Sequence, residues 1–266
     1  TRDARDILER ASARSTVARV AAGSVCRQVL GEFGVRLFGH VLSIGTVEAD
    51  PDRSDLAALA ERAEASEVRC ADASASLAMV AAIRQAQYEG DSLGGLLEVI
   101  AVGVPPGLGG PSEWDTRLDG RLAQAVMSIQ GIKGVEIGLG VSASRLPGSR
   151  VHDPIGYQDG RFVRASNHAG GIEGGISNGE PIVVRAAMKP IPTLATALPS
   201  VDLVTKQAAD AAVERTDSCV VPAAAVVAET AVAFVLLDAL LDKVGGDSSA
   251  ESLRNFGGYL EQVRAL

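Results

Sequence analysis

Residues 164–193 read RASNHAGGIEGGISNGEPIVVRAAMKPIPT, and this stretch carries the strongest structural signals in the chain. Glycine pairs at 170–171 and 174–175 precede the β-branched run Pro181–Met188, which predicts a strand that ends before two closely spaced prolines. A β-hairpin with an Asn178-Gly179 turn is one interpretation. Tight turns alone do not require all of these glycines, and backbone without side chains lets N–H groups approach a phosphate or a flat ring. We therefore favour a ligand-binding loop that leads into a strand.

Helices and strands alternate on both sides of this stretch. Apolar residues at helical spacing predict helices at 3–30, 53–66, 74–88, 118–129, 206–213, 221–244 and 250–266. Runs of β-branched and large apolar residues predict strands at 35–47, 96–104, 134–144 and 181–188. The order lacks the regular βαβ rhythm of a doubly wound sheet, so we predict an α+β fold in layers. No linker rich in proline and serine divides the chain, which indicates a single domain over residues 1–266.

A faint internal similarity links residues 92–106 and 176–190. Each has a turn with glycine, a β-branched strand and then a proline. Such a pattern also recurs by chance. If it reflects a repeat, the fold has two halves related by a pseudo-dyad, with a site between them.

Composition excludes several classes of protein. Hydrophobic residues make up 47% of the 266 residues, which is enough to build a sizeable core. The 25 Lys and Arg against 33 Asp and Glu give a net charge of −8, so broad binding to nucleic acid or to an anionic membrane is not expected. Glu229 and Asp238 interrupt the most apolar stretch, which therefore predicts a core helix and not a membrane span. Three cysteines without a CxxC pair indicate a cytoplasmic protein.

Two segments could supply cations to an anionic ligand. Arg10 and Arg14 would be i,i+4 neighbours on a helix and would form one basic face, although a solvated surface explains them equally well. Arg215 precedes the long apolar helix and suits bidentate contact with phosphate. Asp217 is either a functional carboxylate or the N-cap of that helix. Lys189 stands rigidly before the prolines at the end of a predicted strand.

The histidines show no metal-ligand spacing, so we predict no metal site. His40 lies in a strand pattern and is expected to be structural, whereas His168, in the glycine-rich loop, could serve either purpose. The GLG at 138–140 is not followed by a predicted helix, so the dinucleotide-binding fingerprint is incomplete.

Six segments in order resemble the chorismate synthase family. They are ERASARSTVARVAAG (9–23), GDSLGG (90–95), GVPPGLG (103–109), LDGRLAQAVMSIQGIKGVEIG (118–138), the glycine-rich stretch 164–193 and RTDSCVVP (215–222). They span nearly the whole chain, and the glycine-rich stretch is the most specific of them.

The resemblance implies an enzyme of the shikimate pathway. It would release phosphate from 5-enolpyruvylshikimate-3-phosphate (EPSP) by an anti-1,4 elimination that gives chorismate. The family requires reduced FMN, which is thought to lend an electron transiently and take it back; without a dinucleotide motif here, we expect an external supply of reduced flavin. The implied fold is a layered β-α-β sandwich with internal pseudo-symmetry, central helices flanked by sheets, and assembly as a homotetramer.

The resemblance also implies roles for individual residues. Flavin contacts are expected at Arg10, Ala11, Ser12, Gln130, Gly131, Gly174, Lys189, Pro190, Ile191, Pro192, Thr193 and Arg215. Asp217 matches the acid/base carboxylate of the family, and a carboxylate in a water-poor site is suited to proton transfer near neutral pH. Arg14 is expected to help hold the substrate.

The sequence also departs from the family pattern. The G-[ED]-S-H-G and HAD-type segments, which supply catalytic histidines, are not among residues 1–266 and are expected upstream of Thr1. We therefore expect the chain to correspond to the later part of the enzyme and to turn over little by itself. The alternative is a catalytically inactive flavin-binding fragment or paralogue that acts only in oligomers.

Overall fold

The computed structural model describes residues 12–158, 160–213 and 215–265. Its centre is a five-stranded sheet in the order β2-β1-β3-β9-β4, in which every neighbouring pair is antiparallel. The strands are β1 (Arg36–Ile44), β2 (Val47–Glu48), β3 (Gly95–Val102), β4 (Ile132–Ile137) and β9 (Ile182–Met188). Strands β3 and β9, which carry the two parts of the faint internal similarity, are therefore direct neighbours.

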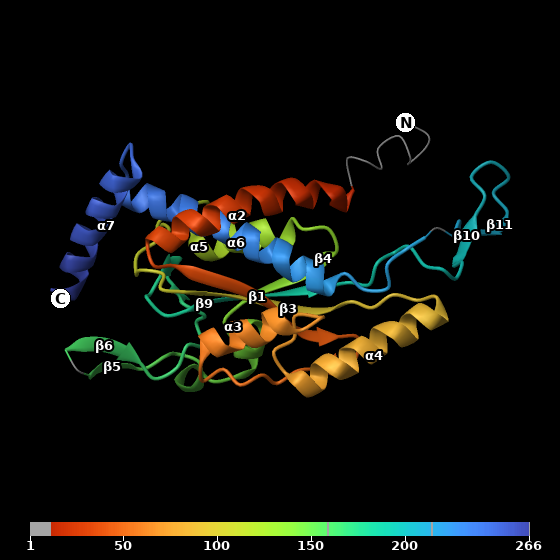
Figure 1. Cartoon of the computed structure of the whole chain (residues 1–266), viewed down its shortest axis with the longest axis horizontal. Coiled ribbons are helices and arrows are strands. Elements are labelled where there is room, and N and C mark those ends of the chain that lie inside the picture. The colour runs from red at the N-terminus through yellow and green to blue at the C-terminus, as the bar shows by residue number, and fades with distance from the viewer. Residues whose placement is uncertain (1–11, 159, 214, 266) are drawn as a thin grey trace.

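Helices lie on both sides of this sheet (Figure 1). One side holds α2 (Thr16–Glu32), α5 (Leu118–Met127) and α6 (Val221–Val244), and α7 (Ser249–Arg264) packs against α6. The other side holds α3 (Leu56–Ala65) and α4 (Ala73–Glu89). Asp55 and Asp72 begin these last two helices, because each carboxylate accepts two backbone N–H groups of the first turn.

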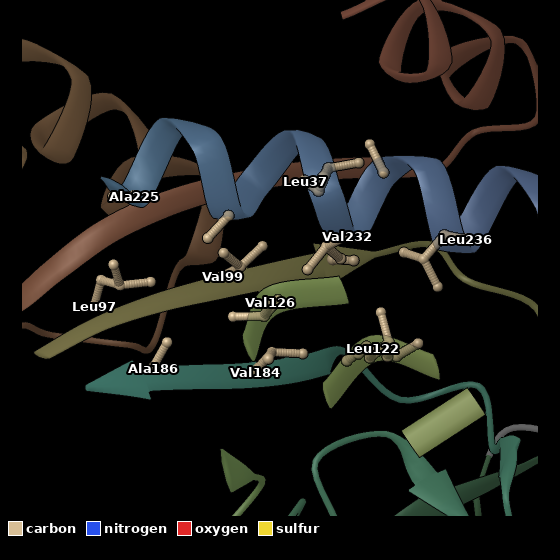
Figure 2. Packing of buried hydrophobic residues seen from close by; sticks show 14 of the residues in the cluster. Leu37, Leu97, Val99, Leu122, Val126, Val184, Ala186, Ala225, Val232 and Leu236 are labelled. Atoms are coloured by element: carbon tan, nitrogen blue, oxygen red, sulfur yellow. The ribbon is translucent and has the colours of Figure 1, made fainter. Parts of the chain in front are cut away.

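The central helix is α6, as the sequence predicts. Figure 2 shows Val232 and Leu236 of α6 in one interior with Val99 of β3 and Val184 of β9. Because α2, α5, β1 and β3 all contact it, α6 can be apolar on most of its circumference. Its length and hydropathy would also suit a membrane span, but 67% of its most apolar window is buried inside the protein, as in a core helix.

Helices α2 and α6 approach each other closely at a glycine. A methyl group on Gly23 would lie 2.3 Å from the Cβ atom of Thr230. The absence of a side chain at Gly23 therefore lets the two helix backbones come together.

Smaller elements complete the chain. Three two-stranded ladders pair β5 (Ile155–Gln158) with β6 (Arg161–Arg164), β7 (Ile172–Glu173) with β8 (Ile176–Ser177), and β10 (Pro199–Val201) with β11 (Ala208–Asp210). Short 3₁₀ helices are η2 (Ala13–Ser15), η3 (Gly140–Arg145) and η4 (Gly148–Arg150).

The helix predicted at 206–213 is wrong. This segment contains β11, the second strand of a hairpin. The carboxylate of Asp202 accepts the backbone N–H groups of Val204 and Thr205, and this side-chain turn reverses the chain between the two strands. Lys206 completes the turn with a positive φ of 61°.

Two other predicted elements have different limits. The strand expected at 134–144 ends at Ile137 and is followed by η3. Within the described residues, the helical part of the range 3–30 begins at Thr16, because Ser12 is extended with ψ 137° and caps η2 instead. Residues 3–11 of that predicted helix lie outside the described residues.

The hairpin turn in the glycine-rich stretch is also misplaced in the prediction. Glu173 pairs with Ile176, so the turn is Gly174-Gly175 and not Asn178-Gly179. Both glycines have positive φ, 61° and 88°, as a two-residue turn of this kind requires.

The predicted mixed α+β class is confirmed, and the structure adds that the neighbouring strands of the sheet are antiparallel. Within the described ranges there is one large sheet, with helices on both of its faces, and the other ladders have two strands each. The sequence also predicted a layered arrangement with central helices between two sheets. The described residues contain one large sheet, so this finer prediction stays a prediction.

Candidate functional site

A cavity of about 640 Å³ opens where four separate segments converge. These segments are η2, the turn before β4, the chain after β9 and the approach to α6. The lining residues are Ala13, Gln130, Gly131, Met188, Lys189, Pro190, Ile191, Pro192, Thr193, Arg215, Thr216, Asp217 and Val220. The volume is within the range of about 300–1,000 Å³ that small-molecule sites usually occupy.

The first wall is the chain that leaves β9. Lys189 is anchored to the sheet margin, because its backbone N–H donates to the Gly131 carbonyl at 3.0 Å. Pro190 and Pro192 then fix two of the next three φ angles. This wall is consequently apolar and stiff, with the half-buried Lys189 at its start.

The floor contains Gln130 and Gly131. Gly131 has a φ of 88°, and a methyl group there would lie 2.8 Å from Met188 Cε. Gln130 donates from Nε2 to Ser15 Oγ at 3.2 Å. Its other side-chain atom, Oε1, is buried and has no hydrogen-bond partner within the described part of the chain. Gln130 thus lines the cavity while its amide is held against the η2 segment.

The second wall is the extended segment before α6. Arg215 and Asp217 are exposed and line the cavity. The hydroxyl groups of Thr216 and Thr193 are 2.7 Å apart, which links this wall to the first. The helix N-cap is Val220, so Asp217 is not the cap that the sequence left open as an alternative.

Charge in the cavity differs from the charge of the whole molecule. Among the described lining residues, Lys189 and Arg215 are the two cations and Asp217 is the one carboxylate, although the net charge of the chain is −8. Local cations on an acidic background favour an anionic ligand over broad binding to polyanions.

Nine predicted site residues meet at this cavity. They are Gln130, Gly131, Lys189, Pro190, Ile191, Pro192, Thr193, Arg215 and Asp217. Ser12 and Arg14 flank the lining residue Ala13, and the Ser12 carbonyl accepts from Gln130 Nε2 at 3.5 Å. Arg10 and Ala11 lie outside the described residues. Ala13, Met188, Thr216 and Val220 were not predicted; their only signal was proximity to the motifs in sequence.

Gly174 is the exception among the described predictions. It lies in the β7–β8 turn, where its carbonyl accepts from Arg117 Nη1 at 3.4 Å. This hairpin precedes the start of β9, whereas the cavity is at the end of β9, and seven strand residues span about 20 Å. Within one chain, Gly174 therefore does not reach the cavity.

The other glycines of the stretch have a packing explanation. A methyl group on Gly170 would lie 2.3 Å from the backbone nitrogen of Gly138, and one on Gly171 would lie 2.6 Å from the Pro181 carbonyl. These two glycines let backbones approach each other, so packing alone accounts for their missing side chains.

A second polar cluster lies away from this cavity, on the sheet face that α3 covers. Glu98 is fully buried; its carboxylate contacts His40 Nε2 at 2.9 Å, Arg53 at 2.6 Å and Arg185 at 2.7 Å. Burial by itself would raise the pKa of Glu98, but the hydrogen bonds and charges of His40 and Arg53 outweigh it and lower the pKa to about 2. His40 is fully buried in this cluster, which agrees with the structural role predicted for it.

Among the described residues, two cations and one carboxylate line a stiff, partly apolar cavity. This arrangement is typical of proteins that bind an anionic small molecule and transfer a proton beside it. Comparison with known proteins narrows this class. The family model described as chorismate synthase matches residues 1–241. The chain belongs to the chorismate synthase family.

Individual relatives agree with this assignment. The chain is 54% identical to the chorismate synthase of Geobacter sulfurreducens over 273 residues, covering 100% of the chain and 70% of that protein. It is 57% identical to that of Moorella thermoacetica, covering 98% and 69%. A solved structure titled "Crystal Structure of Chorismate Synthase" superimposes with a TM-score of 0.86 at 46% identity, covering 100% of this chain and 74% of that one. The chain is thus an enzyme of the phosphate-lyase type that serves aromatic amino-acid biosynthesis by the shikimate pathway.

Proposed function

We propose that the cavity holds reduced FMN and that EPSP binds beside it for the anti-1,4 elimination of phosphate that gives chorismate. The observation that carries the proposal is the convergence on one cavity of nine residues that come from three distant parts of the sequence. An accidental pocket would not collect the residues that the resemblance had assigned to a single cofactor.

The residues present fit an FMN group. Lys189 and Arg215 supply positive charge for its phosphate or for an anionic reduced ring. Gln130 and Gly131 form the floor on which the ring system would rest. The wall 189–193 offers an apolar, proline-stiffened surface for the ring system. Reduced FMN, when bound, would supply electron density to the substrate during the elimination.

Asp217 is the group proposed to move a proton. It is a carboxylate on the cavity wall and, because the helix begins after Val220, its oxygens are not used for helix capping. Arg14, next to the lining residue Ala13, is proposed to hold the anionic substrate at the mouth of the cavity. Excluding water between these groups would favour proton transfer over side reactions.

The assembly belongs to the same proposal. We place the enzyme in the cytoplasm as a homotetramer, with the layered β-α-β arrangement completed by parts other than the described residues. A flavin contact at Gly174 would then come from a second copy of the chain, since Gly174 of the same chain lies at the far end of β9.

A fluorescence-quenching titration tests the proposal. FMN is added to the protein under reducing and oxidising conditions, with and without EPSP. We expect saturable binding that tightens with EPSP, and weaker binding for Lys189→Ala and Arg215→Ala. Arg254→Ala, which removes an exposed cation on α7 far from the cavity, is the matched control and should bind as the parent does. Equal affinity in all four proteins would show that the cavity is not the FMN site.

A further inference from the structure

The segment GDSLGG (90–95) is in contact with both walls of the cavity, yet none of its residues lines the cavity. It follows α4, which ends at Gly90 in the left-handed conformation, and it leads into β3. The sequence resemblance gave this segment no role, and the structure shows what it touches.

Ser92 contacts the first wall from behind. Its side chain is buried at 4% exposure, and its hydroxyl donates to the Ile191 carbonyl at 2.7 Å. Gly94 allows this close contact, because a methyl group there would lie 2.2 Å from the Met188 carbonyl oxygen. The segment therefore packs directly on the backbone that carries Lys189.

Leu93, the next residue, contacts the second wall. Its backbone N–H donates to the Ser218 carbonyl at 2.7 Å, and it forms a parallel bridge with Cys219. Ser218 follows Asp217 directly. The neighbouring residues Ser92 and Leu93 therefore hold the first wall and the second wall of the cavity, respectively. The Thr193–Thr216 hydroxyl contact joins the same two walls on the exposed side.

We propose that Ser92 is a positioning residue of the active site: its hydroxyl fixes the wall 189–193 at a set separation from Asp217. This inference rests on the proposed function, because it assumes that FMN lies against that wall. Ser92 does not line the cavity, so we expect it to act through the Ile191 carbonyl. A small displacement of one wall would change both the fit of FMN and its alignment with Asp217.

Ser92→Ala and Ser252→Ala form a matched pair. Ser252 on α7 is buried at 3% exposure, and its hydroxyl also donates to a backbone carbonyl at 2.7 Å, that of Gly245. Each substitution removes one buried hydrogen bond of the same kind, but only Ser92 adjoins the cavity. FMN affinity, kcat and KM for EPSP, the absorption spectrum of bound FMN and the thermal midpoint are measured for both in the intact enzyme.

We expect Ser92→Ala to weaken FMN binding about threefold to tenfold, as the loss of one hydrogen bond allows. It should lower kcat more than it changes KM and should shift the bound-flavin spectrum, whereas Ser252→Ala should change only the thermal midpoint. Equal effects of the two variants, or none on FMN, overturn the proposal. If Ser92→Ala does not fold, Ser92→Cys is measured instead, because a thiol has nearly the same size but is a weaker hydrogen-bond donor. FMN affinity and kcat equal to those of the parent would then overturn the proposal. Failure of the parent enzyme to bind FMN would instead refute the proposed function.

Discussion

Glu98→Gln should destabilise the protein in a way that depends on pH. The ordinary pKa of a glutamate, 4.5, falls to about 2 in the fold. At ~1.36 kcal/mol per pKa unit, this difference corresponds to about 3 kcal/mol of folding free energy. Because the pKa is lowered by folding, the stabilisation is fully present above pH 4.5 and is lost as the pH falls toward 2. The glutamine variant lacks the charge at every pH.

Urea unfolding followed by circular dichroism measures this effect at pH 7 and at pH 3. The parent should exceed Glu98→Gln by about 3 kcal/mol at pH 7, in line with the cost of breaking a buried ion pair. At pH 3 only about 1.4 kcal/mol should remain by the same linkage relation. A difference that stays constant between the two pH values would mean that Glu98 is not the ionised group that Arg53 and Arg185 hold.

Glu229 provides a control of opposite sign. It is also buried, on the α6 side of the sheet, and burial raises its pKa despite the neighbouring Arg27 and the hydrogen bond from the Gly39 N–H at 2.9 Å. An acid whose pKa is raised by folding contributes stability below pH 4.5 and loses it as the pH rises. As the pH rises from 3 to 7, the free energy of unfolding of Glu229→Gln should therefore increase relative to that of the parent. Over the same range, that of Glu98→Gln should decrease relative to the parent.

Three further changes have defined outcomes. In the intact enzyme, Asp217→Asn should leave FMN affinity nearly intact but slow phosphate release from EPSP by roughly 10²–10⁴-fold, as the loss of a general acid or base does. An unchanged rate would mean that Asp217 takes no part in the chemistry. Gly23→Ala should lower the free energy of unfolding by about 1–3 kcal/mol through overpacking against α6. Gly31→Ala is the control in the same helix, because an added methyl group there would meet nothing within 4 Å; it should be neutral or stabilising by up to ~1 kcal/mol. Equal unfolding midpoints of these two variants would contradict the packing. Leu236→Ala, at a fully buried position, should cost about 2–5 kcal/mol, and Leu77→Ala, at 76% exposure, close to nothing, both measured by urea unfolding.

Much of the core could be predicted because its signals are local. The apolar run 221–244 is too hydrophobic to be anything but a buried or membrane helix, and its charges at Glu229 and Asp238 favoured the former. The rigid wall 189–193 could also be predicted, because two prolines after a β-branched run end a strand and stiffen the residues beyond it. The cation and the carboxylate at 215 and 217 needed the family resemblance as well.

The errors came from interactions between distant residues. The residues next to Gly170 in sequence do not show that the backbone of Gly138 packs against it. The sequence pattern therefore predicts a ligand where the structure has a packing contact. Asp202 turns the chain through its side chain, which outweighed the weak helical pattern of 206–213. The role of Ser92 could not be predicted from the sequence, because it depends on a hydrogen bond to the carbonyl of Ile191, 99 residues later.

Strand β9 connects the buried charges to the cavity, but different groups hold its two regions. Arg185 contacts Glu98 on the face of the sheet opposite α6, and Lys189, four residues later, is fixed instead by its own N–H bond to Gly131. Loss of the Glu98 charge therefore lowers the stability of the sheet without removing a contact of the cavity wall. Folded Glu98→Gln protein should consequently bind FMN as the parent does, whereas Ser92→Ala should bind it less tightly at a smaller cost in stability. This contrast distinguishes residues that stabilise the sheet from those that position the active-site wall.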